Sequence, residues 1–318
     1  MAAARRVWTA LGVVYVAWGS TYVGIRIVDR TVPPLIGGAV RFLVAGTLMY
    51  GFLAVRRRRL LRVSARELAS LALVGVLLLS GGNGLVMVAE QHVPAGLAAM
   101  IVASMPLWVL LLRTLTGDRP RQATLAGLAI GLCGVALLVL RGGHGHGVGV
   151  AQLLIVVCAA LSWATGSFLS SKLPLPSDVF AGTAIQMLIG GVVLAGVGPL
   201  VGEHWSAIAD RASLDAWLAL AYLVFIGSIL AFTAYVWLLQ NAPISKISTY
   251  AYVNPVIAVV LGASILGEAI TPLMAVGGAI TVVAVAVVIR SENRAAALVL
   301  ADAAPLPDEH GPCAAIAP

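Results

Sequence analysis

Long apolar runs separated by short polar breaks make up most of this chain. The ten runs that we predict to be helices cover residues 7–28, 34–55, 67–90, 94–115, 122–140, 149–171, 178–199, 216–239, 244–266 and 272–290. Each is long enough, at ~1.5 Å per residue, to cross the ~30 Å hydrocarbon core of a bilayer. The breaks contain Pro, Gly, Asn and charged residues, as loops do. The pattern predicts an all-α integral membrane protein with ten transmembrane helices.

Composition supports the same interpretation. The chain is 60% hydrophobic and only 10% charged, whereas a soluble domain carries about 25% charged residues. In a soluble protein, the net charge of +7 would suggest a nucleic-acid partner. Here the basic residues lie between the apolar runs, so they indicate membrane orientation, and we expect no nucleic-acid partner.

Lys and Arg are distributed unevenly over the two predicted membrane sides. With the N-terminus placed in the cytoplasm, the inner segments hold fifteen of them and the outer segments three. Because basic loops stay in the cytoplasm, we expect a multi-pass protein of a bacterial-type inner membrane with both termini cytoplasmic. Topology alone explains the inner block Arg56, Arg57, Arg58 and Arg59; binding of anionic lipid head groups is the alternative.

Corresponding residues recur in the two halves of the chain. The matching pairs are Trp18 with Trp163, Arg41 with Gln186, Pro94 with Pro243, and Pro106 with Pro255. Since each half has five helices, an odd number, the second half must enter the membrane upside down, as in many secondary transporters. We therefore expect a first repeat at residues 1–148, an inverted second repeat at 149–290 and a disordered cytoplasmic tail at 291–318.

A series of short motifs resembles a known family. The motifs are Trp18-Gly19-Ser20-Thr21-Tyr22, Pro33-Pro34-Leu35, Arg41-Phe42-Leu43, Gly82-Asn83-Gly84, Ala89-Glu90-Gln91, Val93-Pro94-Ala95-Gly96, Ser162-Trp163-Ala164 and Ser248-Thr249-Tyr250-Ala251-Tyr252-Val253-Asn254-Pro255. Their order and spacing resemble the EamA group of the drug/metabolite transporter superfamily, and within it the YedA-type exporter branch. The family's Gly-Glu pair stands as Gly267-Glu268 in the second half but as Gly117-Asp118 in the first. The resemblance implies ten helices and export of amino acids, related metabolites or toxic compounds.

Arg41 is the sharpest candidate for a role in transport. It lies roughly 10–12 Å into its predicted helix, where a charge costs at least ~2.5 kcal/mol unless it faces the bundle interior and has a partner. Arg26 and Glu90 are predicted at comparable depth. Arg41 either anchors an anionic group of the substrate, or pairs with Glu90 and exchanges that pair during transport. A static ion pair that closes the outer side is the third possibility. Gln186 occupies the matching position in the second half.

Further candidates lie in the same predicted helices. We take as candidate substrate-binding residues Trp18, Thr21, Arg41, Asn83, Trp163, Gln186, Tyr252 and Asn254. Pro106 and Pro255 are predicted to kink their helices and to act as hinges, a plain fixed kink being the alternative. Trp18 and Trp163 are deep enough to form cavity walls, ordinary core packing being the alternative, whereas Trp8 and Trp217 suit the membrane interface.

Other chemistry finds little support in the sequence. His144 and His146 lack carboxylate or thiolate neighbours, so we expect no metal site, and no phosphate-binding loop or other cofactor motif occurs. The alternative to a transporter is an intramembrane enzyme acting on a lipid or prenyl substrate, but the predicted spans contain no His and no paired acids. We predict a secondary transporter rather than an enzyme, and a homodimer remains open.

Overall fold

The computed structural model describes residues 2–117, 122–142, 147–242, 244–247 and 249–302, and within these residues it consists of helices and connecting turns. The α-helices of the first half are α1 (Ala2–Val28), α2 (Pro34–Arg56), α3 (Ala65–Gly75), α4 (Leu85–Glu90), α5 (Ala95–Val102), α6 (Met105–Leu115) and α7 (Gln122–Leu137). Those of the second half are α8 (Val150–Ser170), α9 (Val179–Leu200), α10 (Ser206–Arg211), α11 (Leu214–Tyr222), α12 (Ala231–Asn241), α13 (Ile244–Ile247), α14 (Tyr250–Leu266) and α15 (Pro272–Asp302).

Eight helical segments of the described chain are long and apolar enough to cross a membrane. They are Arg5–Val28, Pro34–Arg56, Ala65–Glu90, Ala95–Leu115, Val150–Ser170, Val179–Leu200, Leu214–Asn241 and Pro272–Ser291. Two shorter apolar helices, Thr124–Leu140 and Val253–Leu266, lie where the fifth and ninth spans were predicted. The chain is therefore a multi-pass membrane protein built of helices.

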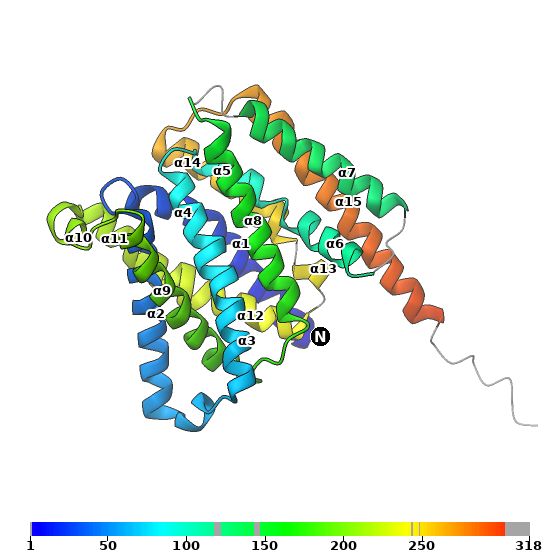
Figure 1. Ribbon diagram of the computed structural model, residues 1–318. Coiled ribbons are helices and arrows are strands. Elements are labelled where there is room, and N and C mark those ends of the chain that lie inside the picture. The colour runs from blue at the N-terminus through cyan, green and yellow to red at the C-terminus, as the bar shows by residue number, and fades with distance from the viewer. Residues whose placement is uncertain (1, 118–121, 143–146, 243, 248, 303–318) are drawn as a thin grey trace, which may run out of the picture.

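Successive connections lie at opposite ends of the bundle. In Figure 1 the N-terminus, the turn after α2 and the end of α15 lie toward the bottom and right. The turns that join α1 to α2, α4 to α5 and α14 to α15 lie toward the top and left. This alternation is the one expected of a chain that crosses a membrane repeatedly.

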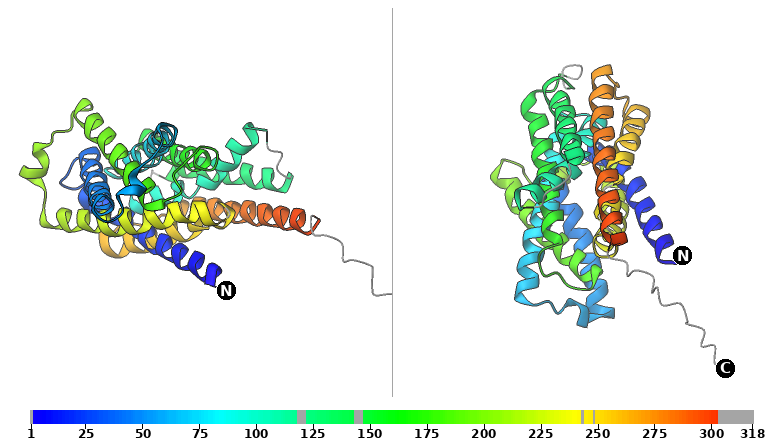
Figure 2. Two further views of the ribbon diagram at one scale, coloured as in Figure 1. Left: turned by 90° about the horizontal axis from the view of Figure 1, so that it is seen from below. Right: turned by 90° about the vertical axis from the view of Figure 1, so that its right-hand side faces the viewer.

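Helix contacts repeat when the two halves are exchanged. The first helix of the first half, α1, packs against α14, and the first helix of the second half, α8, packs against the corresponding pair α5 and α6. Likewise α1 packs against α11 and α12, and α8 packs against α4. The two remaining pairs, α2 with α9 and α7 with α15, each join matching helices of the two halves. Figure 2 shows α15 beside α7 at one flank of the bundle.

Small residues bring α7 and α15 close together. A Cβ atom on Gly134 would lie 2.7 Å from Thr281 Oγ1, and one on Gly277 would lie 2.8 Å from Leu138 Cδ2. The glycines therefore serve helix packing.

Two predicted helices contain a break. The segment predicted at 94–115 is one membrane-length helical segment, Ala95–Leu115, in which α5 and α6 meet at a turn formed by Ala103 and Ser104. Pro106 lies in the first turn of α6. Backbone N–H groups in a first turn have no partner within the helix, so the N–H that proline lacks costs no hydrogen bond there. Pro255 does lie inside a helix, α14, but the break in the segment predicted at 244–266 comes earlier, between α13 and α14.

Two wide π-helical turns occur at matching places in the halves. The turn η2 (Val76–Gly84) links α3 to α4, and the turn η5 (Leu223–Leu230) links α11 to α12. A third, η3 (Leu138–Gly142), follows α7, and a short 3₁₀ turn, η1 (Arg58–Leu61), follows α2. Wide turns of this kind occur mostly at functional sites, so η2 and η5 mark where a site is expected.

Carboxylates from distant segments cap two helices at the upper end of Figure 1. Pro33 precedes α2 and Pro94 precedes α5, and a proline side chain cannot cap a helix. Glu203 instead accepts the Leu35 and Ile36 amide N–H groups at 3.1 and 2.8 Å. Glu268, of the Gly-Glu pair, likewise accepts those of Ala95 and Gly96 at 3.0 and 3.4 Å. The matching Asp118 lies outside the described residues.

The end of the chain differs from the expected tail. α15 continues to Asp302, although disorder was predicted from residue 291. Three alanines at 295–297, followed by Leu, Val and Leu, favour helix strongly, and Pro305 comes only later. Residues 303–318 lie outside the described part of the chain.

Candidate functional site

A small cavity lies between the two halves of the bundle. It has a volume of about 60 Å³ and is lined from α1, η2, α4, α5, α8 and α14. Five of the eight candidate substrate-binding residues line it, namely Trp18, Thr21, Asn83, Trp163 and Asn254. These residues come from positions up to 236 apart in sequence, and the fold brings them to one place.

Sequence reasoning missed the other lining residues. They are Tyr22, Ile25, Gly82, Val86, Val102, Ala159 and Tyr250. Helical spacing offered a signal for several of them, since Trp18, Tyr22 and Ile25 follow each other at i, i+4 and i+7 on one helix face. By the same spacing Tyr250 shares a face with Asn254, whereas Tyr252 does not. The side chain of Tyr252 lies outside the described residues.

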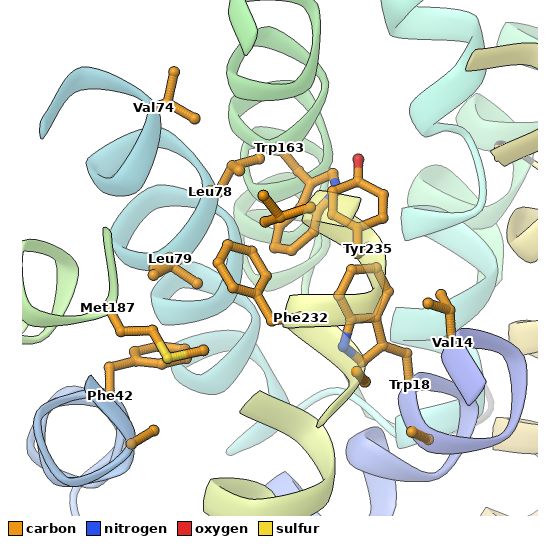
Figure 3. Packing of buried hydrophobic residues seen from close by; sticks show 14 of the residues in the cluster. Val14, Trp18, Phe42, Val74, Leu78, Leu79, Trp163, Met187, Phe232 and Tyr235 are labelled. Carbon is orange, nitrogen blue, oxygen red and sulfur yellow. The ribbon is translucent and has the colours of Figure 1, made fainter. Parts of the chain in front are cut away.

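An aromatic cluster closes one end of the cavity. The Trp18 ring lies 5.2 Å from that of Trp163, 4.8 Å from that of Tyr235 and 5.5 Å from that of Tyr250, measured between centroids. Figure 3 shows Trp18, Trp163, Phe232 and Tyr235 turned toward one another between the helices. These aromatic residues come from four helices, so a movement of any one of the four would change how the cavity is closed.

Hydrogen bonds hold this cluster in place. The Trp18 indole N–H donates to the carbonyl oxygen of Gly227 at 3.1 Å, inside the wide turn η5. The hydroxyls of Tyr235 and Ser167 lie 2.8 Å apart and share a hydrogen bond. The indole ring of Trp18 therefore has a fixed orientation in this structure.

Two glycines of the wide turns make room for the site. A Cβ atom on Gly82 would lie 2.7 Å from Cε3 of Trp163. A Cβ atom on Gly227 would lie 2.8 Å from Cγ2 of Thr21 and 3.1 Å from Nη2 of Arg41. At these two glycines the backbone of η2 and η5 therefore lies closer to the aromatic and charged side chains than it could if either residue had a side chain.

The cavity lining carries no formal charge. Its polar groups are the hydroxyls of Thr21, Tyr22 and Tyr250, the amides of Asn83 and Asn254 and the indole N–H groups of Trp18 and Trp163. Aromatic faces accept apolar groups and cations, and amides and hydroxyls give directional hydrogen bonds. The lining therefore suits a small molecule with an apolar or weakly cationic part and a few polar atoms.

Arg41 lies beside this cavity and does not line it. Its side chain is buried on α2, where Nε donates to Ser228 Oγ at 2.8 Å and the guanidinium lies 4.9 Å from the ring centroid of Phe42. Its Nη1 has no hydrogen-bond partner. Ser228 belongs to η5 and follows Gly227, whose carbonyl oxygen accepts the Trp18 indole N–H. The turn η5 therefore connects Arg41 to Trp18, which lines the cavity.

The ion pair between Arg41 and Glu90, one of the alternatives that the sequence leaves open, is not formed in this structure. Glu90 is fully buried, and neither of its carboxylate oxygens has a hydrogen-bond partner. Arg26 donates instead to the backbone carbonyl of Glu90. Arg41 and Glu90 remain within electrostatic range of each other, and Asp29 and Glu268 are also within range of Glu90. Buried charges in this region are therefore only partly compensated.

Gln186 is buried on α9 and likewise does not line the cavity. Its Oε1 has no hydrogen-bond partner, and Gly75 of α3 packs against its backbone, where a Cβ atom would lie 3.0 Å from the Gln186 carbonyl oxygen. Since α2 packs along α9, Arg41 and Gln186 both belong to the contact between the two halves.

An open groove of about 800 Å³ lies beyond the capped ends of the helices. Asp29 and Glu203 are among the residues that line it. Both carboxylate oxygens of Asp29 are buried without a partner. Burial raises the pKa of this carboxyl well above its usual range; Arg26 opposes the shift and Glu203 adds to it.

The described residues contain no candidate metal site, since no three or more His, Cys, Asp or Glu side chains among them are grouped so that they could hold a metal ion. His144 and His146 lie outside them.

Membrane-length helices around a small aromatic cavity, with matching contacts in the two halves, are typical of a membrane transporter. The model of the EamA-like transporter family matches residues 7–140 and again residues 151–290. The chain belongs to this family, within the drug/metabolite transporter superfamily.

Similar proteins have related descriptions. An Escherichia coli K12 protein described as the uncharacterized inner membrane transporter YedA is 43% identical over 265 residues, covering 83% of this chain and 84% of its own. A probable terminal-alkyne amino-acid exporter of Streptantibioticus cattleyicolor is 29% identical over 301 residues, covering 91% and 95%. A crystal structure with 21% identity and a TM-score of 0.62, covering 91% of this chain and 97% of its own, shares the fold.

Proposed function

We propose that this protein is a secondary transporter that exports small metabolites, of the amino-acid class or related to it, by alternating access. The observation that carries the proposal is the uncharged aromatic cavity between the halves, lined by Trp18, Trp163, Asn83 and Asn254. Two relatives are described as a probable terminal-alkyne amino-acid exporter and, in Salmonella typhimurium, a probable amino-acid metabolite efflux pump, which agrees with the proposal. The substrate is a small neutral or weakly cationic molecule with an apolar part.

The proposed architecture consists of ten spans in two inverted repeats, at residues 1–148 and 149–290, with both termini cytoplasmic. Support comes from the two separate family matches, from the exchange of helix contacts between halves and from the uneven distribution of Lys and Arg. Two apolar helices are too short to count as spans. Thr124–Leu140 lies at the fifth position of the first repeat, and Val253–Leu266 lies at the fourth position of the second. They complete the count if they cross a locally thinned bilayer.

Arg41 and Glu90 are proposed to pair in another state of the cycle. Each has a buried polar group without a partner here, and they lie within electrostatic range. A buried unpaired charge is costly, so a movement of α2 against α4 that joins them would stabilise the state in which it occurs. Arg26 on α1 and Gln186 on α9 lie on helices that pack against α4 and α2, and Pro106 and Pro255 are the proposed hinges of α6 and α14.

A transport experiment tests this function. The intact protein, an Asn83→Ala variant and a Val16→Ala variant are expressed at equal membrane abundance, and secreted metabolites and resistance to amino-acid analogues are measured. Val16 is 64% exposed on the outside of the bundle, so its variant is a matched control. We expect a compound exported by the parent and the control, and about tenfold less by Asn83→Ala, since one hydrogen bond contributes about 1–1.5 kcal/mol.

The same experiment separates transport from enzymatic action. A transported compound is recovered chemically unchanged outside the cell, and counterflow in proteoliposomes of the purified protein reproduces its movement. Recovery of a modified product, or no export over a broad panel, would contradict the proposal. Equal export by Asn83→Ala would leave export in place but remove the cavity as its path.

A further inference from the structure

A basic groove lies at the beginning of α1, far from the central cavity. It has a volume of about 560 Å³ and is lined by Arg5, Arg6, Thr9, Ala10 and Trp237. Figure 2 shows the first turns of α1 projecting beyond the neighbouring helices. The groove is therefore open to whatever surrounds this end of the bundle.

The lining of the groove is positively charged without compensation. Arg5 and Arg6 are exposed, and none of the described residues that line the groove is acidic. The Thr9 hydroxyl already donates to the carbonyl oxygen of Arg5 at 2.9 Å. The guanidinium groups of Arg5 and Arg6 and the indole N–H of Trp237 are thus donors that a ligand could use, and guanidinium geometry matches phosphate oxygens.

Two features beside the groove are typical of a membrane surface. Trp8 is 55% exposed on the same end of α1. The Nζ atom of Lys246, on α13, lies 4.8 Å from the centroid of the Trp8 ring, so a third cation is held beside the arginines. Tryptophan and basic side chains gather at the level of lipid head groups.

Distance along α1 places the groove at that level. Thirteen residues separate Arg5 from Trp18, which corresponds to ~20 Å of helix at ~1.5 Å per residue. The exposed Val16 lies between them on the outside of the bundle, where acyl chains run. A ligand in the groove would therefore lie where the phosphate of a lipid lies while its chains cover the apolar surface below.

We propose that this groove binds the phosphate group of an anionic phospholipid, held by Arg5 and Arg6 with Lys246 beside it. The elements that form the site also carry or adjoin the aromatic cluster. Trp18 lies on α1, Tyr235 is two residues before Trp237, and Tyr250 is four residues after Lys246. A bound head group ties together the ends of α1, α12 and α13, of which α1 and α12 carry residues of the aromatic cluster and α13 precedes the helix that carries Tyr250.

Native mass spectrometry of the full chain, released from nanodiscs of phosphatidylglycerol and phosphatidylcholine, tests the proposal. The Arg5→Gln/Arg6→Gln variant removes two charges from the groove. The Arg62→Gln/Arg66→Gln variant removes two exposed charges near the start of α3, outside the block Arg56 to Arg59, and is the matched control. We expect retention of phosphatidylglycerol to fall about 25-fold in the groove variant, or about fivefold per arginine, and to stay near the parent value in the control.

Other outcomes would overturn the proposal. Equal losses in both variants would mean attraction of lipid by surface charge in general. Unchanged retention in the groove variant, with the parent thermal unfolding curve, would mean that the groove does not hold the lipid. Glycerol phosphate and inorganic phosphate are added in a separate arm, and displacement of the lipid by either at millimolar concentration would identify a free phosphate site instead.

Discussion

At the scale of single residues, the site requires a position that has no side chain. Gly82 lies against the Trp163 ring, where even a methyl group would be 2.7 Å from Cε3. Overpacking of this kind costs about 1–3 kcal/mol when the neighbours cannot move. Trp163 is surrounded by Trp18, Phe232 and Tyr235, so its ring has little freedom to move.

Gly82→Ala is therefore expected to lower both the melting temperature of the purified protein and its transport activity. Gly51→Ala is the control, because a Cβ atom at Gly51 meets nothing within 4 Å. An alanine there should leave activity unchanged and stabilise α2 by about 0.5–1 kcal/mol. An unaltered Gly82→Ala protein would mean that Trp163 can relax, and that the close approach has no role in the site.

Asp29 gives a prediction about pH. Its pKa is raised in the folded protein, so the folded state binds its proton more tightly than the unfolded state, whose pKa is about 3.9. The stability that this provides is complete below the unfolded pKa and is lost as pH rises through the folded pKa. Asp29→Asn should thus unfold at a higher temperature than the parent at pH 8, with a smaller difference at pH 5.

Asp210→Asn is the control for this measurement, because Asp210 lines the same groove but is exposed. Its melting temperature should follow that of the parent at both pH values. If the Asp29→Asn difference were constant with pH, the substitution would act through packing and not through titration.

At the scale of elements, helices are stabilised by groups far away in sequence. α2 and α5 begin after prolines that cannot cap them, and Glu203 and Glu268 supply the missing acceptors. A carboxylate at a helix N-terminus accepts free amide N–H groups and interacts favourably with the helix dipole, for about 1 kcal/mol. The caps therefore join segments across the outer ends of the bundle.

Glu203→Ala should increase hydrogen–deuterium exchange at the start of α2, around Leu35 and Ile36, without a change at α5. Glu67→Ala is a matched control, because Glu67 caps its own helix α3 through Ser64. Its effect should stay within α3. Protection of Leu35 and Ile36 that survives Glu203→Ala would show that another group or water replaces the carboxylate.

At the scale of the whole molecule, the alternation of connections predicts which segments face each side. Cys133, Cys158 and Cys313 are first replaced by serine, and single cysteines are then introduced as Arg57→Cys or His92→Cys. Both positions are exposed, at opposite ends of the bundle. In intact cells a membrane-impermeant maleimide should label only the His92→Cys protein, and Arg57→Cys only after permeabilisation. The reverse pattern would invert the proposed orientation.

Much of the architecture was predictable because a membrane imposes simple rules. Apolar runs of about 20 residues mark helices whatever they pack against, and all ten predicted runs are helical over most of their length. The interruptions were not predictable in the same way. The break before Pro106 and the wide turns η2 and η5 depend on how neighbouring helices satisfy the freed backbone groups.

The candidate site was predicted in part. Trp18 and Trp163 were chosen for their depth and their matching positions, and both line the cavity. Arg41 was chosen by the same argument, yet it lies beside the cavity against Ser228. Depth along a helix follows from counting residues, whereas the direction of a side chain depends on rotation of the helix about its axis.

The sequence by itself determined that this chain is a bundle of membrane helices belonging to a transporter family, because hydropathy, charge distribution and motif order are local properties of the chain. Only the tertiary structure decided which side chains share the cavity, that Arg41 binds Ser228 instead of Glu90, and that Glu203 caps α2. Those contacts join residues more than 150 positions apart. They depend on the rotation of each helix about its axis and on the angle at which it crosses its neighbours. An apolar run does not determine either quantity, because lipid tails are as apolar as the helices; packing of the helices decides both.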